Sequence, residues 1–296
     1  MSKQIPRVMG GFQSGHGLTP GRLAELACLL EVTASKPGNV HRFADLPGLR
    51  FTDFVLSAAA IAEPLDQERA QGVGAMVHAA IIATRRVVST NTNLGMVLLL
   101  APLAQVAEGV DLAAGVEAVL AATTVADASL VYQAIRLAQP GGMGEVPEQD
   151  LGSEPTLTLR AVMSLAAERD LVARQYQNGF HEVLCEGLPA LRESLHDGQA
   201  LETAIVAAYL HLLAKHPDSL ITRKHGPDVS NEVSRRAAGI HAAGWPVREQ
   251  AREICDDFDR WLRQPANRYN PGTTADLVTA SVCAGLMDQS IRLPLH

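Results

Sequence analysis

The most informative stretch of the sequence is Glu31-Val32-Thr33-Ala34-Ser35-Lys36-Pro37-Gly38-Asn39-Val40-His41-Arg42. An apolar run with helical spacing over residues 23–30 leads into it and ends in a carboxylate. Pro37 removes a backbone donor and disfavours helix in the residue before it, and Gly38 permits a positive φ. The stretch therefore predicts a helix that ends in a turn, with four ionisable groups near one loop: Glu31, Lys36, His41 and Arg42. Cations that complement a helix dipole would give a similar pattern.

The composition predicts an all-α protein. Of the 296 residues, 47% are hydrophobic but only 4% are aromatic, so alanine, leucine and valine must fill the core. This composition favours close-packed helices over a β-sandwich, and no segment alternates convincingly between apolar and polar residues. We expect a single compact multi-helix bundle. The predicted helices cover about 20–31, 52–62, 72–88, 94–107, 111–122, 124–138, 157–167, 171–185, 188–195, 200–214, 229–243, 247–262 and 274–287.

Helix-ending and capping signals sharpen several of these boundaries. Thr19-Pro20, Asp111 and Thr124 are predicted to begin helices, and Pro64 is predicted to end one. Residues 1–17 lack the apolar core of a signal peptide and are expected to form a loose N-terminal arm. Residues 18–296 are expected to form a single all-helical catalytic domain.

Charge and cysteine usage restrict the kind of partner. A formal net charge of −7 argues against a nucleic-acid-binding surface. No run of about 18 apolar residues occurs, so we expect no membrane span. The four cysteines are widely spaced and are expected to be reduced, as in a cytoplasmic protein: Cys28, Cys185, Cys255 and Cys283. The expected partners are small nucleotide-like molecules, and the sequence leaves a homodimer open.

Four further polar segments interrupt the apolar pattern, at residues 90–95, 141–145, 216–226 and 270–277. The first offers amide and hydroxyl groups at a helix N-terminus, although simple capping would use the same residues. The second offers glycines that permit close backbone approach to a ligand, or an ordinary solvated loop. The third places a carboxylate upstream of an Arg-Lys-His-Gly turn, and the fourth places Asp276 in the first turn of an apolar helix, where it also complements the dipole. Together the segments predict loops that converge on one cleft around a phosphorylated ligand.

Five motifs occur in order along the chain: Glu-Val-x-x-x-Lys-Pro-Gly (31–38), Asn-Thr-x-x-Gly (91–95), Gly-x-x-Gly-Glu (141–145), Asp-Ser followed by Arg-Lys-x-Gly (218–226), and Gly-x-x-Ala-Asp-Leu (272–277). Each is weak by itself, but the ordered set resembles the triphosphoribosyl-dephospho-CoA synthase family over nearly the whole chain. The resemblance implies an all-helical enzyme that serves the prosthetic group of citrate lyase and malonate decarboxylase.

The reaction that this resemblance implies moves a triphosphoribosyl group from ATP to a hydroxyl of dephospho-CoA, and adenine leaves. Such a transfer needs a carboxylate to take the hydroxyl proton, and a metal with cations for the triphosphate. By this resemblance Glu31, Asp218 and Asp276 are the candidate catalytic residues and the candidate ligands of Mg²⁺. The candidate substrate- and phosphate-binding residues are Lys36, His41, Arg42, Asn91, Thr92, Asn93, Gly144, Glu145, Arg223, Lys224, Thr273 and Thr274.

The chain departs from the family pattern at several positions. Asn93-Leu94 stands where the family usually has His-Lys, Met143 replaces an arginine, and His41 replaces an aspartate. At about 1.5–3 kcal/mol for each charge-assisted hydrogen bond, two lost cations could lower affinity more than a hundredfold unless His41-Arg42 compensates. We therefore expect a divergent branch, a helical (phospho)ribosyl transferase that uses ATP or a related donor, with another acceptor such as a pterin of one-carbon metabolism.

Two other functional classes stay open at this point. The first is a helical Mg²⁺-dependent hydrolase of an N-glycosidic or phosphorylated nucleotide, which would use the same carboxylates with water as acceptor. The second is a non-catalytic helical ligand-binding protein, since the missing cations and aspartate would weaken catalysis. The products separate the first from a transferase, and ligand binding without turnover would identify the second.

Overall fold

The computed structural model describes residues 17–139, 153–266 and 268–293. Its α-helices are α1 (Pro20–Thr33), α2 (Phe51–Gln67), α3 (Val73–Val87), α4 (Leu94–Gln105), α5 (Leu112–Ala121), α6 (Val125–Ala138), α7 (Leu159–Ala166), α8 (Leu171–Asn178), α9 (Leu188–His196), α10 (Leu201–Lys215), α11 (Ser219–His225), α12 (Pro227–Ala242), α13 (Glu249–Arg263) and α14 (Gly272–Met287). A 3₁₀ turn spans Arg69–Gln71 and a π-helix spans Glu182–Gly187. No sheet occurs in the described ranges, where only two isolated β-bridges form, so the all-α prediction is confirmed.

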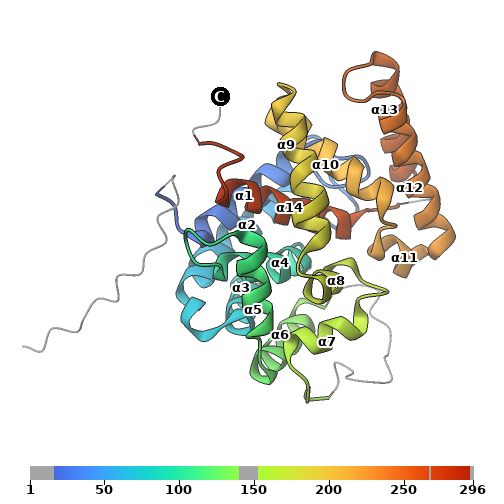
Figure 1. Ribbon diagram of the computed structural model, residues 1–296. Coiled ribbons are helices and arrows are strands. Elements are labelled where there is room, and N and C mark those ends of the chain that lie inside the picture. Colours follow the sequence, from blue (N-terminus) through green and yellow to red (C-terminus); the bar gives the residue numbers. More distant parts are fainter. Residues whose placement is uncertain (1–16, 140–152, 267, 294–296) are drawn as a thin grey trace, which may run out of the picture.

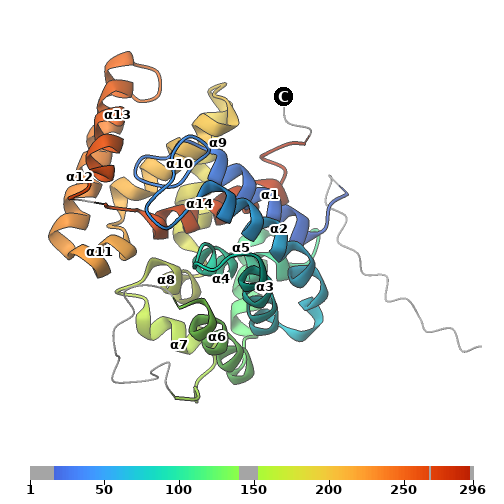
Figure 2. The ribbon, with the colours of Figure 1, turned by 180° about the vertical axis from the view of Figure 1, so that it is seen from behind.

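Two helices form the centre of the core. Residues 96–104 of α4 and residues 277–286 of α14 are all buried, because these stretches are apolar or small on every side. The two helices pack against each other, with α1 and α10 also in contact with α14. Figures 1 and 2 show α14 running through the middle, α12 and α13 together at one edge, and α6 with α7 at another.

The capping predictions are confirmed. Thr19 accepts from the Arg22 amide at 3.3 Å, Asp111 accepts from the Ala114 amide at 3.0 Å, and Thr124 shares a reciprocal pair of hydrogen bonds with Asp127. Such local signals are reliable because the capping side chain and the amide it satisfies lie only three residues apart.

Three boundaries differ from the predictions. Pro64 does not end α2, which continues to Gln67 because a proline in the last turn costs only one internal hydrogen bond. The predicted 171–185 helix divides at Gly179, whose φ of +70° ends α8 before the π-helix begins. Residues 219–225, expected as a polar turn, form α11, because Asp218 accepts from the amides of Leu220 and Ile221.

The four cysteines are free thiols. Cys28, Cys255 and Cys283 are buried, as expected of core residues, whereas Cys185 is exposed. Among the described helices, no single one is long and apolar enough to cross a membrane; α5 and α6 reach that length and composition only as a pair bent by 96°. The division into an arm (1–17) and one domain (18–296) stays a prediction, because residues 1–16 lie outside the described ranges.

Candidate functional site

A cleft of about 820 Å³ lies where α4 and α14 begin. Three of the polar segments supply part of its lining, from residues 90–95, 220–224 and 270–276. The opening stretch contributes only Asn39, whose amide donates to the Asn270 side chain at 2.9 Å. The segment 141–145 lies outside the described residues, and with it Gly144 and Glu145.

Seven of the predicted site residues line this cleft: Asn91, Thr92, Asn93, Arg223, Lys224, Thr273 and Asp276. They come from the α3–α4 loop, from α11 and from the first turns of α14. Their convergence requires α11 and α14 to be fixed against each other, which depends on Asp218.

Asp276 is the least satisfied carboxylate of the cleft. Within the described ranges no hydrogen bond or ion pair holds its side chain, which lies over Gly95 in the first turn of α4. A Cβ built on Gly95 would stand 2.0 Å from Asp276 Oδ2, so only glycine leaves room for the carboxylate. Burial, and then the charges of Glu31, Asp218 and Asp170, raise the pKa of Asp276 well above its ordinary value, although Arg223 opposes this. A carboxylate of raised pKa is a stronger base once deprotonated.

Asp218 is saturated with hydrogen bonds and does not line the cleft. One oxygen accepts from the amides of Leu220 and Ile221 at 2.9 and 3.1 Å, and so caps α11. The other accepts from the amide and hydroxyl of Thr274 at 2.7 and 2.8 Å. Burial raises the pKa of Asp218, and these donors act against the rise. One buried carboxylate thus ties the start of α11 to the start of α14.

Glu31 and Lys36 form a fully buried ion pair away from the cleft lining. Lys36 Nζ lies 3.1 Å from Glu31 Oε1 and donates to the carbonyls of Glu31 and Ala34 at 2.6 and 3.1 Å. Burial raises the pKa of Glu31 and lowers that of Lys36, and each partner opposes the shift of the other. The three donors of Lys36 are therefore all engaged inside the protein.

His41 and Arg42 also lie outside the cleft lining. Arg42 pairs with Glu202 at 2.6 Å and covers the ring of Phe43. Burial, together with the nearby charges of Arg263 and Lys36, lowers the pKa of His41 to about 4. His41 is consequently neutral at pH 7 and adds no positive charge.

The predicted carboxylates do not assemble as one metal-binding group. Within the described ranges, no three His, Cys, Asp or Glu side chains are grouped so that they could hold a metal ion. Glu31 faces Lys36 and Asp218 faces four donors, which leaves Asp276 as the one free carboxylate of the three. Residues 17–139, 153–266 and 268–293 therefore do not fit a resident ion held by these three carboxylates.

The structure adds residues that the sequence reasoning missed. Arg85, Arg169 and Asp170 line the cleft. In the sequence, Arg85 lies at the end of a predicted helix, where a cation complements the helix dipole. Asp170 directly precedes another predicted helix, where an aspartate serves as an ordinary cap. Asp170 does cap α8, accepting from the amides of Val172 and Ala173, and its second oxygen pairs with Arg223 Nη1 at 2.5 Å. The capping signal at Asp170 was readable, but its pairing with a residue 53 positions away was not.

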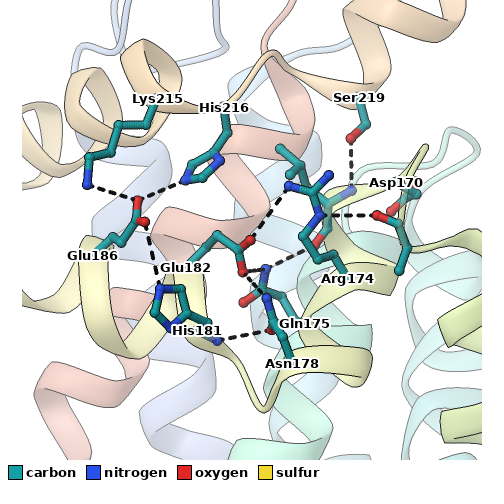
Figure 3. A network of polar contacts seen from close by, with 12 residues as sticks. Asp170, Arg174, Gln175, Asn178, His181, Glu182, Glu186, Lys215, His216 and Ser219 are labelled. Atoms are coloured by element: carbon teal, nitrogen blue, oxygen red, sulfur yellow. Dashed lines mark hydrogen bonds and ion pairs between the residues drawn. The ribbon is translucent and has the colours of Figure 1, made fainter.

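Behind the cleft, a polar network fixes the segments that carry Asp170 and Asp218 (Figure 3). Buried Glu182, in the π-helix, accepts from Gln175 and Asn178 at 2.8 Å each, and lies 3.7 Å from Arg174. Glu186, one turn later, meets His216 at 2.8 Å and Lys215 at 3.5 Å. Burial alone would raise the pKa of Glu186, but His216 and then Lys215 lower it. The two carboxylates hold α8 on one side and the α10–α11 turn on the other.

Three buried polar atoms of the cleft lining have no hydrogen-bond partner among the residues that the structure describes: Thr90 Oγ1, Asn93 Oδ1 and Arg223 Nε. Buried polar groups are nearly always paired, because an unmade hydrogen bond costs about 1–3 kcal/mol. Their concentration in one cleft is typical of a site that a polar ligand completes. Another wall of the cleft is apolar, formed by residues of α6 and α7: Tyr132, Ile135, Val162, Met163, Leu165 and Ala166.

Comparison with known proteins bears on the family to which the chain belongs. The family model described as ATP:dephospho-CoA triphosphoribosyl transferase (CitG) matches residues 18–294. A crystal structure from Archaeoglobus fulgidus, provisionally assigned as a triphosphoribosyl-dephospho-CoA synthase, is 26% identical to the chain, with a TM-score of 0.61. The alignment covers 78% of this chain and 97% of that one. No curated protein sequence matches the chain. The family match covers nearly the whole sequence, and the chain belongs to the ATP:dephospho-CoA triphosphoribosyl transferase family of enzymes.

Proposed function

We propose that this chain transfers the triphosphoribosyl group of ATP to an acceptor hydroxyl, with dephospho-CoA as the first acceptor to test. Asp276 is the observation that carries the proposal. It is a cleft carboxylate of raised pKa with no partner among the described residues, between a polar α4 N-terminus and the cations of α11. In this role it accepts the proton of the attacking hydroxyl while adenine leaves C1 of the ribose.

The proposed roles of the other cleft residues follow from the chemical groups that their side chains offer. Asn91, Thr92 and Asn93 supply amides and hydroxyls that suit ribose hydroxyls, as does Thr273. Arg223 and Lys224 supply charge for phosphates. Asp218, Thr274 and Lys36 are assigned to positioning, because their polar groups are already engaged with one another or with backbone. Glu31 is assigned to positioning because its carboxylate is buried beside Lys36, outside the cleft lining. His41 and Arg42 have no assigned contact with the substrate, and Gly144 and Glu145 keep their predicted substrate-binding role.

We propose that Mg²⁺ binds to the protein together with the nucleotide. Mg²⁺ is commonly held by one or two carboxylates together with substrate phosphates, so Asp276 and a bound triphosphate suffice as anchors. We expect Mg²⁺ to bind measurably only when ATP is present. Isothermal titration of Mg²⁺ into the protein, with and without ATP, tests this; tight binding to the protein alone would contradict it.

The function itself is tested by its products. Incubation with ATP and dephospho-CoA should release adenine and yield an acceptor heavier by one triphosphoribosyl group, measured by chromatography and mass spectrometry. Adenine release with free ribose triphosphate, and no acceptor required, would instead identify the hydrolase. If dephospho-CoA stays unmodified while a pterin acceptor gains the group, the transferase assignment holds and the acceptor changes. Binding of ATP without release of adenine would identify a non-catalytic protein.

A further inference from the structure

The cleft is cationic in a protein that is acidic as a whole. Four cations and two carboxylates of the described residues line it: Arg85, Arg169, Arg223, Lys224, Asp170 and Asp276. The chain as a whole carries a formal net charge of −7. A positive cleft on an acidic background concentrates anionic ligands at the site.

Arg223 is held so that one edge of its guanidinium has no hydrogen-bond partner among the described residues. Its Nη1 donates to Asp170, and Asp170 is itself fixed by the α8 amides. The opposite edge consists of Nε and Nη2. Nε is buried with no hydrogen-bond partner, and Nη2 makes no hydrogen bond within the described ranges. This edge is the planar fork that arginine uses for two parallel hydrogen bonds to a phosphate. Because Nε is covered, the side chain must shift to present the fork, and the gain from satisfying a buried N–H favours that shift.

Arg169 and Lys224 line the same cleft as Arg223, with charges that no described residue neutralises. Both side chains are exposed and line the cleft, and neither forms an ion pair or side-chain hydrogen bond within the described part of the chain. Arg169 directly precedes Asp170, and Lys224 directly follows Arg223, so the ion pair between Asp170 and Arg223 brings the backbone positions of the two cations close together. Neither is needed to hold the fold.

We infer that Arg169, Arg223 and Lys224 form a polyphosphate subsite, in which Arg223 binds one phosphate through two parallel hydrogen bonds and the flanking cations bind the next ones. The inference rests on the proposed function in taking the donor triphosphate as the ligand, but the site chemistry itself asks only for a linear polyphosphate. It assigns a binding role to Arg169, which lies outside the five sequence motifs. It also makes Asp170 the residue that orients Arg223.

The experiment uses two probes that separate the halves of the donor, inorganic tripolyphosphate and adenosine. Their affinities are measured by isothermal titration calorimetry at fixed ionic strength, for the full chain and for Arg169→Ala, Arg223→Lys and Arg86→Ala. Arg86 is the matched control, because it is an exposed arginine next to Arg85 that does not line the cleft. Circular dichroism melting checks that each variant is folded.

Arg169→Ala should weaken tripolyphosphate binding about tenfold, and Arg223→Lys about ten- to a hundredfold, since lysine cannot make two parallel hydrogen bonds. Adenosine affinity should not change, and Arg86→Ala should bind both probes as the unaltered chain does. Unchanged tripolyphosphate affinity in both cleft variants would overturn the subsite, as would an equal loss in Arg86→Ala, which would indicate diffuse charge attraction. Arg169→Ala is exposed and tests the inference even if Arg223→Lys fails to fold.

This measurement is independent of turnover. If tripolyphosphate binding depends on Arg169 but no adenine is released from ATP, the subsite stands and the proposed function fails. If adenine is released and Arg169→Ala has the KM for ATP of the unaltered chain, the function stands and the subsite fails.

Discussion

The C-terminal end of α1 and the N-terminal end of α14 look alike in sequence, each with a carboxylate at the end of an apolar helix. In the folded chain the carboxylate of the first end has a cationic partner, and the carboxylate of the second end has none among the described residues. Glu31 is 1% exposed and paired with Lys36, whose three donors are all engaged. Asp276 lines the cleft and has no partner in the described ranges. The first end is a closed polar unit, and the second is open to a ligand.

The difference shows how to separate a structural charge from a functional one. A buried charge is tolerated when its partners are already in the fold, and a strongly perturbed one beside a cleft marks a candidate site. Asp218 accepts four hydrogen bonds within the fold, although its motif resembles that of a catalytic residue. The number of free donors and acceptors decides the assignment here, whereas residue type does not.

The largest expected effect is on turnover at the open end. Asp276→Asn keeps the shape but cannot accept the hydroxyl proton, so kcat should fall by about 10²–10⁴. The measurement is adenine release under saturating ATP and acceptor. In the unaltered chain, activity should fall as pH is lowered through the pKa of Asp276, and the raised pKa moves this acidic limb above the range of an ordinary aspartate. Turnover within a few fold of the unaltered chain would return Asp276 to a structural role.

The second effect is on stability at the closed end. Lys36→Met leaves Glu31 buried without its cation and should lower the free energy of unfolding by about 3–5 kcal/mol, measured by urea denaturation. The double variant Glu31→Leu/Lys36→Met is the control, because removing both charges should recover much of this loss. If Lys36→Met is as stable as the unaltered chain, the ion pair between Glu31 and Lys36 does not stabilise the fold.

A smaller effect tests the contact between α4 and α14. Gly95→Ala places a Cβ where Asp276 Oδ2 lies, so the carboxylate must move. A misplaced catalytic group can cost about a hundredfold, so we expect kcat to fall by up to about that factor while the melting temperature changes little. Gly239→Ala is the control, since a Cβ there meets nothing within 4 Å and should leave turnover unchanged. Equal turnover in both variants would show that the position of Asp276 does not matter.

The smallest effect is a gain of stability in Asp276→Asn. Because the pKa of Asp276 is higher in the folded chain than in the unfolded one, the folded state binds more protons. The carboxylate therefore lowers stability as pH rises above its unfolded value of about 4, up to its folded pKa. Asparagine removes this penalty, so the variant should be more stable at pH 7 and no more stable at pH 3. Melting curves at both pH values test this, and lower stability at pH 7 would contradict it.

The sequence by itself determined most of the helices, the caps at Thr19, Asp111 and Thr124, and, by resemblance, the family. The helices and caps depend on apolar spacing over one or two turns and on capping groups a few residues away, so they can be predicted without long-range contacts. The family was inferred from the resemblance of five ordered motifs. Pro64 was misjudged because a proline in the last turn of a helix costs only one internal hydrogen bond, and α11 was missed although its cap, Asp218, directly precedes it.

Only the tertiary structure decided which ionisable groups have a hydrogen-bond or ion-pair partner within the fold. Thr274 donates to a carboxylate 56 residues away, and Arg223 pairs with one 53 residues away. The room for Asp276 depends on a glycine in another helix. Local spacing carries no information on such contacts, yet in a poorly hydrated interior they decide whether a charge is satisfied by the fold or left for a substrate.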